Sequence, residues 1–467
     1  MVDRAIDETL SSRAGHLFIE EVDGADIAER FGTPLYVLSE TRLRANARAY
    51  RAAFGAAWPH GEVHVLPSLK ANFSLAVARV LVDEGLGCDV FGPSEFAVAT
   101  RSGFPGELVS LNGSMKDQAL LDAAVAAGVR ITLDAEVELG RVIDAARRLD
   151  RVARVRLRGR PDYTGLDLPT DFLDEPVPMS EASRRYKAGI PTADLLEMGR
   201  AALGQPEVEL SGLMAHMPRH RTELEVWSEA AERFGDLVGT AVDAWDGWRP
   251  RELDLGGGLP SRRDPTGRLI GRIADEQRAT APPVTDYADA IARPLAARLR
   301  GQGIEPDGIA LEVEPGRGMF ADAGIHLTTV RNVKHEAEPL SWTWVETDTS
   351  EMFLLDSLVE HNLWQCVAAT RMDDLAVGPV DIVGRSCGFD LIVPDAHLPV
   401  VGDGDLLAFL DTGAYQEASA TNFNAMPRPA SVLVRDDTVT LIKRAETVED
   451  VFDRDVVPDR LALGASR

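Results

Sequence analysis

The chain has 467 residues and carries 75 acidic against 49 basic side chains, for a formal net charge of −26. Proteins that bind nucleic acid or anionic membranes usually present a basic field, so this balance argues against both partners and favours small molecules. Charged residues interrupt every apolar run well before the ~20 residues that a membrane-spanning helix needs. The first 13 residues lack the apolar core of a signal peptide, and we therefore expect a cytoplasmic protein.

Short apolar runs alternate with longer segments of helical period through the middle of the chain, which predicts parallel strands joined by helices. The eight strand-like runs are 64–69, 88–91, 108–112, 130–134, 155–158, 210–216, 252–255 and 309–314. Helical segments lie between them at 75–84, 93–101, 116–127, 135–148 and 193–203. Eight such units predict a (β/α)8 TIM barrel of the α/β class. We interpret two Pro/Gly/Asp-rich segments, 165–190 and 261–285, as loops inserted at the barrel ends.

The pattern changes after residue 324, where strand-like runs follow one another with little helix between them. These runs are 326–333, 341–345, 381–383, 406–409 and 431–443, and they predict a C-terminal all-β domain. An earlier run, 35–38, precedes the barrel, so we expect N-terminal strands to complete that β domain. The expected organisation is an N-terminal segment 1–40 that joins the β domain, a barrel 41–325, a β domain 326–455 and a tail 456–467.

Chemically capable residues follow three of the predicted barrel strands, and in a TIM barrel such positions face the active site. Lys70 ends the first strand; a lysine at a buried mouth can lose its proton and attack an aldehyde, although strand-end lysines also simply reach water. Three glycines, 256–258, end the seventh strand and can bring backbone N–H groups close to a phosphate, or form a plain turn. Glu314 and Arg317 end the eighth strand around a Pro-Gly pair, as an anion site or as a surface ion pair.

In this order the motifs resemble the fold-type III pyridoxal 5'-phosphate (PLP) decarboxylases, which include the diaminopimelate, ornithine and biosynthetic arginine decarboxylases. The resemblance covers residues 33–446. It rests on K-A-N at Lys70, C-D-V at Asp89, N-G-S-M-K at 112–116, L-R at Arg158, A-H-M-P-R at His216, the glycine run 256–258, E-P-G-R at 314–317, G-R-S-C at 384–387, G-A-Y at 413–415 and N-x-x-P-R-P at 424–429.

The resemblance implies a barrel like that of alanine racemase, PLP as cofactor, no metal, and a homodimer with its active sites at the subunit interface. It implies four catalytic residues: Lys70, which binds PLP covalently; His216, which stacks on the pyridine ring; Glu314, which bonds the ring nitrogen; and Cys387 of the partner subunit, which returns a proton after carbon dioxide leaves. The implied cofactor contacts are Lys70, Asp89, Arg158, His216, Gly256, Gly257, Gly258, Glu314, Gly316, Arg317 and Tyr415. Alanine racemases carry an arginine in place of the glutamate, so Glu314 favours decarboxylation.

Two segments depart from the pattern where that family recognises its substrate. Diaminopimelate decarboxylases carry C-E-S-G-D after the cysteine, whereas here Gly388 and Phe389 follow, and their R-P-x-L-Y segment aligns with 354–359, which holds neither Arg nor Tyr. We therefore predict an amino-acid decarboxylase (a carboxy-lyase of amino-acid metabolism) that acts on a non-standard substrate rather than meso-diaminopimelate. Candidate substrate contacts are Arg219, Asp348 and Asp390. A racemase or other PLP lyase on the same scaffold, and a non-catalytic homologue, remain alternatives.

Overall fold

The computed structural model describes residues 4–165, 169–172, 175–219, 221–263, 281–339, 341–360, 362 and 364–461. The chain forms two compact units. A barrel unit comprises residues 40–323 and 413–418, and a β unit comprises residues 1–39, 324–412 and 419–467. Among the helices in the described part of the chain, none is long and apolar enough to cross a membrane.

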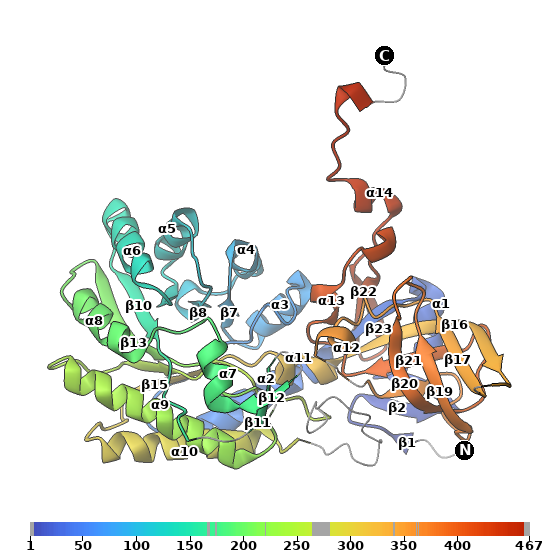
Figure 1. The fold of residues 1–467 in the computed structure, drawn as a ribbon, viewed down its shortest axis with the longest axis horizontal. Coiled ribbons are helices and arrows are strands. Elements are labelled where there is room, and N and C mark those ends of the chain that lie inside the picture. Colours follow the sequence, from blue (N-terminus) through green and yellow to red (C-terminus); the bar gives the residue numbers. More distant parts are fainter. Residues whose placement is uncertain are drawn as a thin grey trace. The chain divides into compact units, whose positions relative to one another are not determined.

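Eight parallel strands form the sheet of the barrel unit within the described residues, in the order β6-β15-β14-β13-β10-β9-β8-β7 (Figure 1). A parallel bridge between Ser68, just after β6, and Asp89 of β7 joins the two ends of this sheet. The barrel is therefore nearly closed, which confirms the predicted fold class. The strands are β6 (Val63–Val65), β7 (Cys88–Val90), β8 (Val109–Leu111), β9 (Arg130–Leu133), β10 (Ala153–Arg158), β13 (Val208–Met214), β14 (Glu252–Asp254) and β15 (Ala310–Val313).

Helices follow the strands around the barrel, and local sequence signals fix their ends. The Asp117 side chain accepts a hydrogen bond from the Leu120 N–H before α5, and Gly128 ends that helix with a φ of 70°. A left-handed residue at this position is typically glycine, because it has no Cβ. The helices are α2 (Glu40–Ala57), α3 (Leu75–Asp83), α4 (Pro93–Ser102), α5 (Gln118–Ala127), α6 (Glu136–Leu149), α8 (Thr192–Leu203), α9 (Leu224–Ala244), α10 (Val284–Gly301), α11 (Arg317–Phe320) and α13 (Gln416–Ser419).

The first predicted inserted loop, 165–190, is not an irregular loop in the structure. It holds an antiparallel pair, β11 (Pro169–Phe172) with β12 (Glu175–Pro178), followed by α7 (Met179–Arg185). Prolines favour extended backbone and are tolerated in a two-stranded ribbon because one side of each strand needs no hydrogen bond. Most of the second predicted loop, 261–285, lies outside the described residues.

The β unit is built on a sheet to which both ends of the chain contribute. β5 (Leu35–Ser39) lies between β16 (Gly324–Glu336), to which it is antiparallel, and β22 (Ala430–Arg435), to which it is parallel. This arrangement confirms that N-terminal residues complete the C-terminal β domain. The other elements are β1 (Arg4–Ala5), β2 (Leu10–Arg13), β3 (His16–Ile19), β4 (Val22–Asp23), α1 (Gly24–Phe31), β17 (Trp342–Thr347), α12 (Asp356–Val359), β18 (Cys366–Ala368), β19 (Gly378–Val383), β20 (Leu391–Leu398), β21 (Leu406–Leu410), β23 (Thr438–Lys443) and α14 (Val448–Phe452).

Candidate active site

Lys70 lies at the mouth of the barrel, beyond the end of β6, with 45% of its side chain exposed. Its Nζ donates to the Ser68 hydroxyl and lies 3.2 Å from Asp89 Oδ2. Desolvation lowers the pKa of Lys70, but the charges of Asp89, Tyr415 and Glu314 and the hydrogen bond to Asp89 together outweigh this effect, and the net pKa is raised. The ammonium form is therefore favoured, which differs from the sequence expectation of a readily deprotonated lysine; the reason is the carboxylate beside it.

Asp89 is held in place by donors on three sides. Its Oδ2 accepts from Ser68 and its Oδ1 accepts from Asn112 Nδ2 at 2.7 Å. Burial alone would raise the pKa of Asp89, but the charge of Lys70 and these hydrogen bonds hold it below its ordinary value. Asn112 Nδ2 also donates to Glu314 Oε1, so one amide links the carboxylate near the lysine with the carboxylate at the end of β15.

Glu314 is 4% exposed and lies above a cluster of charges inside the barrel. Arg156 of β10 lies 3.9 Å from Glu314 Oε1 and 2.7 Å from Asp254 Oδ2. Burial raises the pKa of Glu314 well above its ordinary value; the charges of Asp254 and Asp89 raise it further, and Arg156 opposes them. A carboxyl in this state can share a proton with a basic ring nitrogen placed against it.

His216 lies two residues beyond the end of β13, and Arg158 is the last residue of the neighbouring strand β10. His216 Nδ1 donates to the Met217 carbonyl at 2.8 Å, and desolvation together with the charge of Arg158 lowers the pKa of His216 to about 3. The imidazole is therefore neutral and can pack against an aromatic ring. Arg158 is 6% exposed, and its guanidinium has no hydrogen bond or ion pair with any residue that the structure describes. The guanidinium lies 6.0 Å from the centre of the Tyr186 ring.

The glycine run after β14 approaches neighbouring backbone so closely that side chains do not fit. A Cβ on Gly257 would lie 2.3 Å from the Glu314 carbonyl oxygen, and one on Gly258 would lie 2.2 Å from the Pro218 carbonyl oxygen. Gly256 and Gly258 also have φ values of 62° and 102°, which L-residues rarely adopt. This chain therefore needs glycine here, and the result is a tight turn at the barrel mouth in which Gly256 and Gly257 are buried and Gly258 is half-buried.

Arg317 and Tyr415 complete this side of the mouth. The Arg317 guanidinium, 5% exposed, lies 5.0 Å from the centre of the Tyr415 ring. A Cβ on Gly316 would come within 2.6 Å of the Tyr415 hydroxyl. The Tyr415 N–H donates to the Ala71 carbonyl at 2.7 Å, which fixes the tyrosine segment to the chain beside Lys70.

These groups match the parts of PLP. Lys70 is an amine at the mouth, Glu314 is a buried carboxyl that can bond a ring nitrogen, and the glycine turn with Arg317 offers donors to a phosphate. The turn has no room for side chains between its backbone and the neighbouring carbonyl oxygens, and the buried guanidinium of Arg158 has no anionic partner among the described residues. The donor set therefore fits the cofactor that the sequence implied.

The remaining predicted site residues divide between the two units. Arg219 follows His216 in the barrel unit, is exposed, and contributes to the lowered pKa of His216. Cys387 lies on an exposed loop of the β unit, where its N–H donates to Asn424 Oδ1 at 2.9 Å and its Sγ accepts from Asn424 Nδ2 at 3.2 Å. Asp390 closes the same loop by accepting from Ser350 Oγ at 3.0 Å and from two backbone N–H groups.

The sequence interpretation assigned no role to several residues that the structure places in the site. Ser68, Asn112, Asp254 and Arg156 all contact a predicted site residue. Asn112 lies inside the N-G-S-M-K motif and Ser68 lies two residues before K-A-N, so nearness to a motif was the available signal. Arg156 had none, because arginines alternate with apolar residues along β10 and such a pattern indicates a strand with one exposed face.

The fold and the site together define a barrel enzyme that uses PLP. The model of the pyridoxal-dependent decarboxylase, pyridoxal binding domain, matches residues 40–321. The chain is 29% identical to the diaminopimelate decarboxylase of Methanocaldococcus jannaschii over 97% of its length and 98% of the relative. It is 32% identical to that of Actinosynnema pretiosum subsp. auranticum, over 95% and 93%.

Solved structures agree with the sequence relatives. The crystal structure of the M. jannaschii diaminopimelate decarboxylase in complex with L-lysine has a TM-score of 0.86 and 27% identity, and the match covers 97% of this chain and 99% of that one. The chain belongs to the pyridoxal-dependent decarboxylases, and it is a carboxy-lyase with pyridoxal 5'-phosphate as its cofactor.

Proposed function

We propose that this enzyme removes the α-carboxylate of an amino acid other than meso-diaminopimelate. We further propose that it acts as a homodimer in which each barrel is completed by Cys387 of the partner subunit. Two features support the second proposal: Cys387 lies on an exposed loop of the β unit, and Phe389 on the same loop is 100% exposed. Aromatic residues are enriched at protein–protein interfaces, so an exposed phenylalanine two residues from Cys387 is consistent with a loop that a partner covers.

PLP, when bound, accepts the electron pair that remains on the α-carbon as carbon dioxide leaves. The residues of this chain prepare and complete that step. Lys70 would attach the cofactor, Glu314 would bond its ring nitrogen, and the neutral His216 would pack on its ring. The glycine turn, Arg317 and Tyr415 would hold its phosphate. Cys387 of the partner subunit would donate a proton to the α-carbon in the place of the lost carboxylate, so that the product is an amine.

The observation that carries the substrate proposal is the chemistry of two segments. In the segment aligned with R-P-x-L-Y, Leu354 is fully buried, while Leu358 and Val359 are 48% and 60% exposed. This segment offers neither a guanidinium nor a phenol to a distal carboxylate. After Cys387, Gly388 and Phe389 stand where the relatives have an acidic residue for a distal ammonium. A zwitterionic end desolvated without either partner is costly, which disfavours meso-diaminopimelate.

The test measures carbon dioxide release by the purified holoenzyme from a panel that contains meso-diaminopimelate, lysine, ornithine and amino acids with acidic, neutral and aromatic side chains. An unpaired buried charge costs about 2–5 kcal/mol, so we expect kcat/KM for meso-diaminopimelate to be about 30- to 5,000-fold below that of the best substrate. If meso-diaminopimelate is the best substrate of the panel, the substrate proposal is wrong. Chiral analysis of recovered substrate detects racemisation, and loss of the cofactor absorbance in Lys70→Ala identifies the attachment residue.

A further inference from the structure

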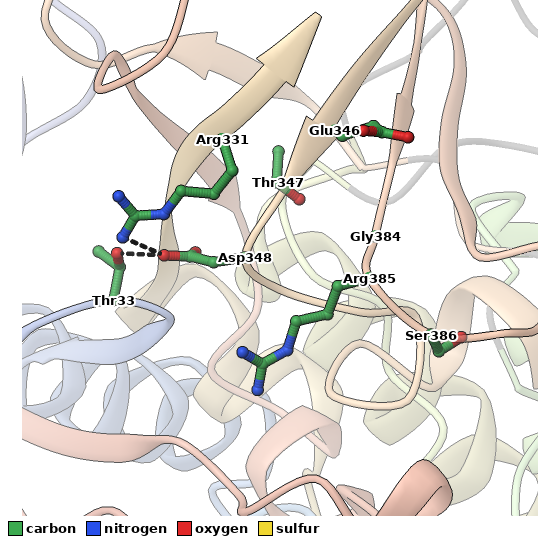
Figure 2. A pocket seen from close by; sticks show the side chains of 8 residues that line it. All are labelled: Thr33, Arg331, Glu346, Thr347, Asp348, Gly384, Arg385 and Ser386. Carbon is green, nitrogen blue, oxygen red and sulfur yellow. Dashed lines mark hydrogen bonds and ion pairs between the residues drawn. The ribbon is translucent and has the colours of Figure 1, made fainter.

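The β unit contains a pocket of about 580 Å³ beside the loop that carries Cys387. Figure 2 shows Arg331 and Asp348 on one side of this pocket and Arg385 and Ser386 on the other. Arg331 belongs to β16, whereas Arg385 follows β19. The pocket therefore depends on the folded β unit and cannot be recognised from any single motif.

The two acidic side chains of the pocket are already neutralised. Asp348 is 7% exposed and accepts four hydrogen bonds, from Thr33 Oγ1 at 2.7 Å, Thr328 Oγ1 at 2.7 Å, the Thr329 N–H at 3.0 Å and Arg331 Nη2 at 2.9 Å. Glu346 accepts from Asn332 Nδ2 at 2.7 Å and pairs with Lys334. These carboxylates have their donors already, so a ligand ammonium would have to displace them.

Arg385 is the charged pocket residue whose side chain is not yet accounted for. Its backbone N–H donates to the Thr349 carbonyl at 3.0 Å, which fixes the residue at the pocket wall. Within the described part of the chain, its exposed guanidinium makes no hydrogen bond and no ion pair, and Figure 2 draws no dashed line to it. Because Arg331 pairs with Asp348, and Glu346 pairs with Lys334 from outside the pocket, Arg385 carries the one charge of this group that no described residue balances. A planar guanidinium of this kind suits a carboxylate or a phosphonate.

The position of Arg385 links the pocket to the reaction. Cys387 lies two residues further along the same loop, and two residues of chain span at most about 7 Å. The loop is fixed by Asp390, whose carboxylate accepts the Ser386 and Glu351 N–H groups. A substrate whose α-carbon receives a proton from Cys387 can therefore extend its side chain toward Arg385.

We propose that this pocket binds the far end of the substrate side chain, and that this end is an anion such as a carboxylate or phosphonate without an accompanying ammonium. Arg385 is the residue that pairs with it. This inference rests on the proposed function, since it takes Cys387 as the proton donor, and it names the substrate class that the proposed function left open.

The first test needs no turnover. The holoenzyme is alkylated with iodoacetamide, and labelling of Cys387 is followed by peptide mass spectrometry, which separates it from Cys88 and Cys366. Glutarate is the anionic probe and cadaverine the cationic probe of similar length. At ten times its Kd, glutarate is expected to slow labelling about tenfold, because the occupied pocket covers the loop. Cadaverine is expected to have no such effect.

Matched variants test whether Arg385 is the cation that binds glutarate. In Arg385→Gln the protection by glutarate is expected to disappear, in Arg385→Lys to persist in weaker form, and in Arg454→Gln, an exposed arginine near the C-terminus, to equal that of the wild type. The inference is overturned if glutarate does not protect, if protection survives in Arg385→Gln, or if cadaverine protects equally.

The second test asks whether the bound anion is the substrate's own end or a separate effector. Decarboxylation of α-aminoadipate, norleucine and lysine is compared in the wild type and Arg385→Gln. We expect the wild type to prefer α-aminoadipate, Arg385→Gln to raise its KM at least about tenfold with little change for norleucine, and glutarate to inhibit competitively. Non-competitive inhibition that depends on Arg385 overturns the assignment to substrate. Absence of carbon dioxide from every substrate refutes the proposed function. The labelling result tests anion binding at Arg385 and does not depend on turnover.

Discussion

Replacing Arg156 with methionine removes a positive charge from the centre of the barrel, where the guanidinium has no exposed surface. The side chain lies 2.7 Å from Asp254, 3.9 Å from Glu314, and pairs with Glu312. Glu312 keeps Arg130 as a second cation, at 2.5 Å. Asp254 keeps a backbone N–H donor but loses the cation closest to it. The substitution therefore leaves a buried carboxylate without its counter-charge.

Removing one partner of a buried ion pair costs about 3–5 kcal/mol. At 1.4 kcal/mol per factor of ten, this lowers the equilibrium constant for folding by about 100- to 5,000-fold. Arg147→Met is the matched control: Arg147 lies 2.7 Å from Glu207, but 57% of its side chain is exposed. Exposed pairs contribute about 0–1 kcal/mol, so the control is expected to lose little stability.

The assay is urea unfolding of the cofactor-free wild type and both variants, followed by tryptophan fluorescence. Four of the seven tryptophans are buried in the barrel unit, namely Trp58, Trp227, Trp245 and Trp248. If Arg156→Met is no less stable than Arg147→Met, then Arg130 alone compensates the cluster and the reasoning is refuted.

A second consequence concerns the pH dependence of catalysis. Arg156 opposes the effects that raise the pKa of Glu314, so its removal raises that pKa further. The carboxylate form of Glu314 then appears only at higher pH, and the ascending limb of kcat against pH is expected to move upward. The same limb is expected to stay in place for Arg147→Met. If the limb does not move in either variant, Arg156 does not influence the pKa of Glu314.

Three further predictions concern single residues. Gly257→Ala places a Cβ 2.3 Å from the Glu314 carbonyl oxygen and is expected to weaken PLP binding about tenfold in a fluorescence titration; an unchanged Kd would contradict a role of this turn in holding PLP. Asn424→Ala removes both hydrogen bonds to Cys387, so kcat is expected to fall about tenfold while cofactor absorbance is retained, and equal kcat would show that the thiol needs no such support. Burial lowers the pKa of His326 to about 3. Below pH 6.5 the unfolded chain therefore takes up a proton that the folded chain does not, and the free energy of unfolding decreases as the pH is lowered. Urea midpoints at pH 6.5 and 5 should show this loss of about 2 kcal/mol in the wild type but not in His326→Gln, and equal pH dependence would refute it.

Much of the barrel and its cofactor site could be predicted from the sequence because both depend on local order. The predicted run 130–134 corresponds to β9 (Arg130–Leu133), and the predicted helix 93–101 corresponds to α4 (Pro93–Ser102). In a parallel barrel every strand ends on the same face. Motifs that follow separate strands, such as those at Lys70 and Glu314, are therefore brought to one mouth whatever the distance between them in the chain.

Features that depend on distant pairing had no comparable signal. The short strands β1 and β4 hold two residues each, which is too few for a hydrophobic period to be recognised. Arg156 could be interpreted as an exposed strand residue until the closed barrel placed it against carboxylates from β14 and β15.

The predicted substrate contacts likewise depend partly on short motifs and partly on distant pairing. The sequence by itself determined that the family's carboxylate and ammonium contacts are missing, because those contacts belong to short motifs. Only the tertiary structure decided that four donors satisfy Asp348, and that Arg385 lines a pocket with no partner among the residues that the structure describes. The physical reason is that the charge left in a pocket is a balance over residues from several strands, and chain order does not specify which of them meet.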